Sequence, residues 1–323
     1  MTITLFDTYT SSLNSGDAII MDAIKDNLNH ILPFEYIVTY PTHYPLSKKA
    51  LKKSTSNSLL FVGGTNLLNS FLNFTGKKNQ WSIGYLDSFY FENKAILMGC
   101  GWNKYQNNYN FFSKQIYKNI LSKKYLHSVR DSYSQYKLSE LGVKNVLNTG
   151  CPTLWKLTNN HCSKINKYKS TNVLFTLTDY SKNFAKDSFL VSTLLKNYND
   201  VYFWIQGAND LHYLKELNLD KLPNRPKLIT SDLKQLNCFL EENKNIDYIG
   251  TRLHAGIKAM HHQCRSIIIA IDNRAIEMAK DFNLNIILRE ELEQKLDKTI
   301  NSEVKTEIKL PDKDIALWLD QFN

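Results

Sequence analysis

Long apolar runs are absent from this sequence. The longest purely aliphatic run is IIIAI at residues 267–271, whereas a membrane-spanning helix needs about 20 apolar residues. The N-terminal stretch MTITLFDTYT has neither a basic segment nor a small-residue cleavage site, so we expect no secretory signal. These absences favour a cytoplasmic protein, and they leave open a peripheral contact with the inner face of the cell membrane.

Cysteine is scarce and shows no pairing pattern. The five cysteines form an odd set without a C-x-x-C spacing: Cys100, Cys151, Cys162, Cys238 and Cys264. A chain of 323 residues can bury a core that needs no disulfides. We therefore expect reduced thiols.

Repeats and low-complexity tracts are also missing. Hydrophobic residues make up 43% and charged residues 22% of the chain, which is ordinary for soluble globular proteins and excludes a disordered one. At 323 residues, the chain exceeds the size at which a single core keeps growing. We therefore expect two domains of about 150 residues each.

The positive charge is concentrated in the first half. Residues 1–150 carry 16 lysines and arginines against 9 acidic residues, and the remainder carries 24 against 22. Such a field favours anionic partners: phosphorylated substrates, the phosphates of a lipid carrier, membrane headgroups or nucleic acid. The lysines, however, are scattered over helical patterns such as SKKALKKS at residues 47–54. Because no nucleic-acid motif accompanies them, no nucleic-acid partner is expected.

Short aliphatic runs alternate with helical patterns along the first half. Residues 2–6 predict a strand, and residues 18–32 predict a helix with one apolar stripe. Further strands are expected at residues 35–41, 58–64, 94–101, 125–131 and 144–152. Most of these runs end in Gly, Ser, Asp or Asn and pass directly into a helix start. This order is typical of a parallel α/β sheet.

The second half restarts the same alternation after a polar stretch. Residues 158–171 are expected to link an N-terminal α/β domain, 1–157, to a C-terminal one, 172–310. Strands are expected at residues 172–177, 200–207, 227–231, 246–250 and 266–272, followed by a helix at 274–284. The amphipathic segment 311–323 could pack back on the N-terminal domain. We therefore predict two Rossmann-like α/β domains facing across a cleft, with ligands at the carboxyl ends of the strands.

The stretch IDYIGTRLHAGIKAM, residues 246–260, carries the most chemistry. A strand turns at Gly250 and Thr251 into a helix whose first-turn N–H groups and dipole favour an anion. Arg252 adds a planar fork for a carboxylate or phosphate, and the His254 imidazole could act as an acid near neutral pH. The alternative is structural: Arg252 pairs with an acid across the domain, and His254 caps a helix or fills a core edge.

A similar arrangement occurs in the first half, in LHSVRDSYSQYKLSELG. Arg130 follows a strand, and Asp131 is expected to cap a helix that ends at Gly142. Arg130 could be a second cationic contact in the cleft, or it could hold a neighbouring carboxylate.

Two further strand ends offer small or polar residues. In NSGDAII, Asn14 or Ser15 can cap a helix, and Gly16 permits close backbone approach. Asp17 suits either a first-turn acid or a general base for an incoming hydroxyl. In FVGGTNLL, the pair at residues 63–64 lets a ligand or a helix come close.

A metal site is not expected. Three histidines and a cysteine fall close together in sequence: His254, His261, His262 and Cys264. Their spacing matches no standard zinc pattern, and a helix would direct the two adjacent histidines to different sides.

Five stretches occur in an order that resembles the polysaccharide pyruvyl transferase family: NSGDAII, FVGGTNLL, SVRDSYSQYKLSELGV, NTGCPTLW and GTRLHAGIKAM. The resemblance implies a two-domain architecture similar to GT-B glycosyltransferases. It also implies transfer of the enolpyruvyl unit of phosphoenolpyruvate onto sugar hydroxyls as a cyclic ketal. By the same resemblance Arg130, Arg252 and His254 contact the donor, with Thr251 and the backbone N–H of Leu253 beside them.

The implied chemistry fits these residue types. Phosphoenolpyruvate carries a carboxylate and a phosphate a few bonds apart, which suits two arginines and a helix start. His254 is the expected acid and Asp17 the expected base, while Asn14, Gly16, Gly63 and Gly64 are expected on the acceptor side or in the cleft. The acceptor is expected to be a glycan or a lipid-linked oligosaccharide, with the N-terminal domain on the acceptor side. No cofactor is expected.

The sequence departs from the family pattern near the expected cleft. Thr65 stands where a third glycine is usual, HQCRS at residues 262–266 replaces a G-x-P turn, and Arg274 stands where a lysine is often found. A glycosyltransferase that uses a nucleotide-activated sugar therefore remains an alternative, in which Arg130 and Arg252 would hold a diphosphate. A more remote alternative is a non-catalytic nucleic-acid-binding protein.

Overall fold

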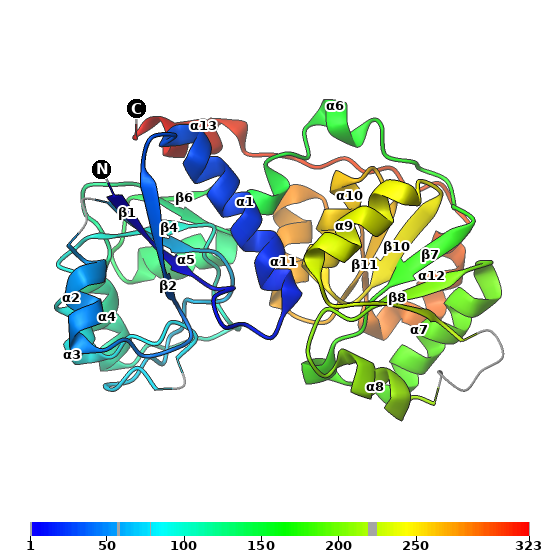
Figure 1. The fold of residues 1–323 in the computed structure, drawn as a ribbon, viewed down its shortest axis with the longest axis horizontal. Helices are drawn as coiled ribbons and strands as arrows, with labels where there is room; N and C mark the ends of the chain where they lie inside the picture. The colour runs from blue at the N-terminus through cyan, green and yellow to red at the C-terminus, as the bar shows by residue number, and fades with distance from the viewer. Residues whose placement is uncertain (1, 57–58, 78, 219–224, 323) are drawn as a thin grey trace. The chain divides into compact units, whose positions relative to one another are not determined.

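A computed structural model of the chain describes residues 2–56, 59–77, 79–218 and 225–322 (Figure 1). The chain divides into two compact units. The first unit comprises Met1–Ser12, Ile20–Trp155 and Leu310–Asn323, and the second comprises Leu13–Ile19 and Lys156–Lys309. Helix α1 (Ser15–Ile31) therefore begins in the second unit and continues in the first.

The first unit contains a parallel sheet of short strands, which are buried except for one edge strand. It has four strands in the order β2-β1-β3-β4: β1 (Thr2–Asp7), β2 (Tyr36–Pro41), β3 (Leu59–Gly63) and β4 (Ala95–Met98). Strands β5 (His127–Val129) and β6 (Val146–Asn148) pair with each other, and a bridge from Cys100 to Val129 places β5 beside the chain that leaves β4. All of the strands predicted in this half are present.

Amphipathic helices cover this sheet, as the sequence pattern requires. They are α1 and then α2 (Lys48–Ser54), α3 (Tyr85–Ser88), α4 (Phe111–Ile120), α5 (Ser132–Glu140) and α13 (Asp312–Asp320), with a 3-10 turn at Pro152–Leu154. In α1 the predicted apolar stripe is buried at Ile20, Ile24 and Leu28. The C-terminal helix α13 buries Trp318 in the same unit, against Phe61 with 6.3 Å between the ring centroids.

The second unit contains six parallel strands in the order β12-β11-β10-β7-β8-β9. They are β7 (Asn172–Phe175), β8 (Val201–Trp204), β9 (Lys227–Ile229), β10 (Ile246–Gly250), β11 (Ser266–Ala270) and β12 (Ile286–Leu288). From β7 the chain builds toward one edge of the sheet and from β10 toward the other. The boundary between β7 and β10 is therefore the topological switch point, where open α/β sheets bind ligands at the carboxyl ends of the strands.

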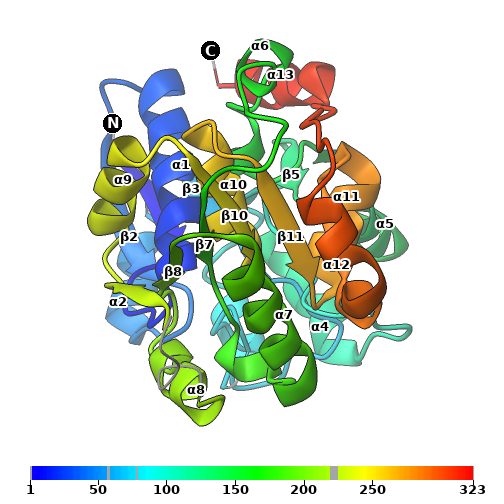
Figure 2. The same cartoon turned by 90° about the vertical axis from the view of Figure 1, so that its right-hand side faces the viewer.

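Helices lie on both faces of this second sheet. They are α6 (Asn159–Cys162), α7 (Phe184–Asn197), α8 (Asp210–Glu216), α9 (Leu233–Glu242), α10 (Leu253–His261), α11 (Asn273–Phe282) and α12 (Leu292–Ile300), with 3-10 turns at Asp179–Ser181 and Arg289–Glu291. Helices α7 and α12 lie side by side (Figure 2) and share one apolar core with the strands.

The segment expected as a linker, residues 158–171, contains α6 and belongs to the second unit. His161 Nε2 lies 2.8 Å from the carbonyl oxygen of Met260, which attaches α6 to the end of α10. Strand β12 was not predicted; its three residues follow closely on the helical pattern of residues 274–284. Within the described ranges, every helix is too short or too polar to cross a lipid bilayer.

Candidate functional site

The switch point of the second sheet is held together by backbone and threonine contacts. A Cβ at Gly250 would lie 2.6 Å from the backbone nitrogen of Thr176. The end of β10 can therefore lie this close to the chain that leaves β7 only because residue 250 is a glycine. The N–H of Thr251 donates to the Thr176 carbonyl over 3.1 Å, and its hydroxyl lies 2.8 Å from that of Thr178. These contacts fix the start of α10.

Arg252 stands at this start and is almost fully buried, with 4% of the residue exposed. Its Nε donates to the carbonyl of Leu177 over 3.0 Å, and its Nη2 donates to Asp179 over 2.9 Å and to Asp210. The ring centroid of Tyr180 lies 5.0 Å from its Cζ. Burial lowers the pKa of the guanidinium, but Asp210, Tyr180 and Asp179 together outweigh burial, and the net pKa is raised. Arg252 is therefore a charged group that pairs with acids of its own unit.

The segment around Asn14 lies at the same edge of the second unit. Asn14 forms an antiparallel bridge with Gly207, and the N–H of Ser15 donates to the Gln206 carbonyl over 2.9 Å. The Asn14 Oδ1 accepts from the Gly16 N–H over 3.0 Å and from Gln206 Nε2 over 2.8 Å. The predicted cap of this helix start is thus made by Asn14, and it also attaches the start of α1 to the loop after β8.

Gly207 joins the Asn14 segment to the arginine. A Cβ at this position would lie 2.5 Å from Arg252 Nη2. Its backbone N–H donates to Asp210 Oδ2 over 2.7 Å, the carboxyl group that also binds Arg252. The structure therefore brings Asn14, Gly16 and Arg252 to one edge of one sheet, although the sequence placed them in different halves.

His254, Leu253 and Asp17 occupy first helical turns at this edge. Leu253 and His254 begin α10, and each is 5% exposed. Asp17 lies in the first turn of α1, is 7% exposed, and its N–H donates to the Asn14 carbonyl over 3.0 Å. The dipole of a helix favours the ionised form of a carboxyl group in its first turn.

A second arginine lies beside the first. Arg274 Nη2 donates to the Tyr180 hydroxyl over 2.6 Å, and its Nε donates to Asp272 Oδ2 over 3.0 Å. The Tyr180 ring is the one that Arg252 covers. Arg274, noted from the sequence only as a departure from the family lysine, is thereby linked to Arg252 through one phenol.

In the first unit, Arg130 is held by its own neighbours. It is 1% exposed, its Nε donates to Asp131 Oδ2 over 2.8 Å, and its Nη1 donates to Asn66. A Cβ at Gly101 would lie 2.2 Å from its Cζ. Asp131 also caps α5, since its Oδ1 accepts from the Ser134 N–H over 2.7 Å, as predicted. Arg130 does hold a neighbouring carboxylate.

The glycine pair at the end of β3 makes room for α1. A Cβ at Gly63 would lie 3.0 Å from Met21 Cε, and one at Gly64 would lie 2.3 Å from Ile20 Cγ2. Gly64 has a φ of 57°, and Thr65, in place of the usual third glycine, has a φ of 49°. These two glycines therefore lie close to side chains of helix α1.

Several residues of the site were missed from the sequence: Asp179, Tyr180, Gln206, Gly207 and Asp210. Each follows β7 or β8, and both of these strands were predicted. The carboxyl ends of parallel strands meet at one edge of a sheet. The positions of these residues directly after the predicted strands were therefore the signal that could have placed them at the site.

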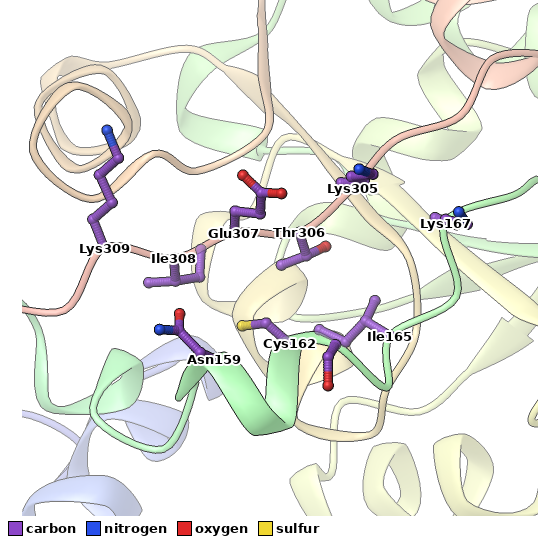
Figure 3. A pocket seen from close by; sticks show the side chains of 10 residues that line it. Asn159, Cys162, Ile165, Lys167, Lys305, Thr306, Glu307, Ile308 and Lys309 are labelled. Carbon is purple, nitrogen blue, oxygen red and sulfur yellow. The ribbon is translucent and has the colours of Figure 1, made fainter.

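No three His, Cys, Asp or Glu side chains gather into a possible metal site in the part of the chain that the structure describes. A pocket of about 600 Å³ lies between α6 and residues 305–309 (Figure 3). Cys162 and Ile165 line one side, and Thr306 and Ile308 line the other. None of the predicted site residues lines this pocket.

The two parallel-sheet units define the class of the protein as GT-B-like α/β. The fold is similar to that of a UDP-GlcNAc 2-epimerase from Methanocaldococcus jannaschii in complex with UDP-GlcNAc and UDP, with a TM-score of 0.55, 15% identity, and coverage of 96% of this chain and 95% of that chain. It is also similar to S. aureus MnaA in a co-structure with UDP, with a TM-score of 0.53, 11% identity, and coverage of 94% and 91%. At such identities the likeness shows the fold alone.

The model of the polysaccharide pyruvyl transferase family matches residues 14–273. The chain belongs to this family and is a transferase, and the family implies a polysaccharide acceptor. No curated protein sequence matches the chain.

Proposed function

We propose that this protein transfers the enolpyruvyl group of phosphoenolpyruvate onto sugar hydroxyls of a cell-surface polysaccharide or its lipid-linked precursor, forming a pyruvate ketal. Membership of the family supports the proposal. The observation that carries it is the start of α10 at the switch point of the second sheet, with Arg252 and His254 in one turn. The first turn of a helix directs its N–H groups outward and attracts anions.

The donor has to share Arg252 with acids of the protein. The Asp210 carboxyl is fully buried, whereas the side chain of Asp179 is 17% exposed. Asp210 is therefore the permanent partner and Asp179 the exchangeable one. In this proposal an anionic group of phosphoenolpyruvate replaces Asp179 on Nη2 and lies against the Leu253 N–H, beside Thr251.

The chemistry assigns one proton transfer to each of two side chains. His254 protonates the methylene carbon, so that the neighbouring carbon becomes electron-poor and a sugar hydroxyl attacks it. Asp17 accepts a hydroxyl proton. The bond from that carbon to the phosphate oxygen breaks and phosphate leaves. A second hydroxyl of the sugar then closes the ketal and gives its proton to the departing phosphate, and the proton on Asp17 returns through solvent to His254. This scheme transfers no electrons, so it uses no redox cofactor.

The remaining predicted residues keep narrower proposed roles. Arg130 is proposed as a further donor contact because of the family resemblance. Asn14 and Gly16, at the edge beside Arg252, are proposed to line the acceptor side of the site. Gly63 and Gly64 can serve a cleft only through their backbone, because side chains of α1 fill the space beside them.

The test is to incubate the protein with phosphoenolpyruvate and lipid-linked glycan fragments, and to measure released phosphate and the mass of the glycan. We expect phosphate release that depends on the glycan, and a glycan heavier by one pyruvate less one water. Phosphate release without a heavier glycan, or no release with any acceptor, would refute the proposal.

A nucleotide-activated sugar is the second candidate donor. The two solved structures of similar fold hold UDP, and one of them also holds UDP-GlcNAc. A thermal-shift measurement with phosphoenolpyruvate and with a panel of sugar nucleotides separates the two candidates, since only a ligand of the folded state raises the melting temperature.

A further inference from the structure

Exposed aromatic side chains of the first unit form a continuous surface. Phe74, Phe89 and Phe111 are 46%, 51% and 62% exposed, and Leu86 is 58% exposed. Tyr85 connects the rings: its centroid lies 6.2 Å from that of Phe74, 5.2 Å from Phe89 and 6.3 Å from Phe111. We call these five residues the aromatic face. Large apolar residues exposed together, rather than singly, mark an interaction surface.

The aromatic face is built on α3 and α4, which adjoin each other in the first unit (Figure 1). Helix α4 buries Ser113, Ile116, Tyr117 and Ile120. Its opposite stripe is Phe111, Lys114 and Lys118, all exposed. The sequence thus places an aromatic ring and two lysines on the outward side of one helix.

The stretch of sequence that carries the aromatic face is strongly basic. Residues 66–126 contain eight lysines but only two acidic residues, Asp87 and Glu92. One of the two acids is engaged, since Asp87 Oδ2 accepts from the Gly84 N–H over 3.0 Å at the start of α3. Residues 66–126 therefore carry most of the excess positive charge of the first half.

A small hollow borders the aromatic face. Its volume is about 250 Å³, and its lining includes Phe89 together with Lys118 and Lys123. Glu92 also lines it, with polar side chains from α3, α4 and the loop between them. Two lysines beside an exposed ring can contact a phosphate whose apolar substituent continues over the aromatic face.

We propose that the aromatic face docks the protein on an anionic phospholipid bilayer, with the rings in the interfacial layer and the lysines on lipid phosphates. Aromatic rings with basic neighbours are the side chains that interfacial proteins place at this depth. A second copy of the chain fits less well, because it would bring like charges together. The biological reason for docking depends on the proposed function, since a lipid-linked acceptor lies on the membrane.

The test is flotation of the full chain with two kinds of vesicle: phosphatidylcholine alone, and phosphatidylcholine mixed with phosphatidylglycerol. We expect binding to the mixed vesicles only, weakening as salt is added. Lys114→Glu with Lys118→Glu should reduce the partition constant at least about tenfold, since each basic residue near an anionic surface adds roughly fivefold. Phe89→Ser with Phe111→Ser should reduce it as well.

Matched controls lie outside the aromatic face. Phe34 is 90% exposed, so Phe34→Ser removes an equally accessible ring, and Lys280→Glu reverses an exposed charge on α11. Both variants should bind vesicles as the unchanged protein does. Circular dichroism and melting temperature verify that each variant is folded.

Three results would overturn the proposal: no binding to the mixed vesicles, equal binding by face and control variants, or self-association that the face variants abolish. Phosphate release with a water-soluble glycan fragment separates the two proposals. Face variants should retain that activity and lose it only with the acceptor in vesicles. If no acceptor gives phosphate release, the proposed function is refuted. The vesicle-binding measurement still tests the docking proposal in that case.

Discussion

A Cβ on Gly207 would lie 2.5 Å from Nη2 of Arg252. The guanidinium cannot easily move away, because it is fixed by the Leu177 carbonyl and by two carboxylates. The position of Arg252 at the start of α10 therefore requires a glycine at residue 207, in the loop after β8. The absence of a side chain at Gly207 thus lets two segments far apart in the sequence approach closely at one edge.

Gly207→Ala should destabilise the protein by about 1–3 kcal/mol, the usual cost of forcing a methyl group into packed surroundings. The variant should also lose donor binding, because Arg252 has to leave its partners. Urea unfolding and calorimetric titration with phosphoenolpyruvate measure the two effects. Unchanged stability would show that the loop after β8 moves to accommodate the methyl group, and that the close approach of Gly207 to Arg252 does not constrain the fold.

The two carboxylates on Arg252 should respond differently to neutralisation. Asp179→Asn should strengthen phosphoenolpyruvate binding roughly tenfold, because a like charge a few ångströms from the ligand costs on the order of 1 kcal/mol or more. Asp210→Asn should instead cost about 3 kcal/mol of stability, since it leaves a buried guanidinium without its main partner. Weaker binding in the Asp179 variant would contradict the exchange of this side chain for the donor.

His254→Gln should reduce kcat by about 100-fold or more, which is the contribution typical of a general acid. The dissociation constant for phosphoenolpyruvate should change far less, because the proton is needed only in the chemical step. Phosphate-release kinetics and calorimetry provide the two readouts. Full turnover in this variant would exclude His254 as the acid.

His127 should make the first unit sensitive to acid. The side chain is fully buried, its Nδ1 accepts from the Leu97 N–H over 3.2 Å, and its Nε2 lies 2.9 Å from the Ser122 carbonyl. Burial lowers its pKa to about 4, from 6.5. The unfolded chain therefore binds more protons between these values. The stability contributed by the neutral ring is complete above pH 6.5 and is lost as the pH falls to about 4.

Comparing His127→Asn with the unchanged protein isolates this effect. The difference between their unfolding free energies should shrink by up to about 3 kcal/mol between neutral pH and pH 4. Urea unfolding across this range measures it, and His212→Asn, on an exposed histidine, is the control. A difference that does not vary with pH would mean that the pKa of His127 is the same in the folded and the unfolded chain.

The sequence predicted most of the fold because local patterns carry it. Aliphatic runs that end in Gly, Ser, Asp or Asn located the strands in both halves, apart from the three-residue β12. Asp131 was recognised as a cap because its backbone partner lies three residues along the chain. The start of α10 was predicted for the same local reason, and anion binding at this turn stays a prediction.

The partners of the arginines could not be predicted in this way. Asp179 and Asp210 lie 73 and 42 residues from Arg252, and no local pattern relates them. Their proximity follows from the strand order, which places β7 between β10 and β8. The same holds for Gly64, whose neighbour Ile20 comes from a helix that ends well before β3 begins.

By itself, then, the sequence determined the parallel α/β class, the family, the helix starts and the excess of positive charge, since each depends on residue types and short spacings. Only the tertiary structure decided which charges are already paired and which rings remain exposed. Pairing and exposure depend on side chains that arrive from distant strands and helices. A buried arginine with two acids and an exposed phenylalanine beside lysines therefore became visible only in the folded chain.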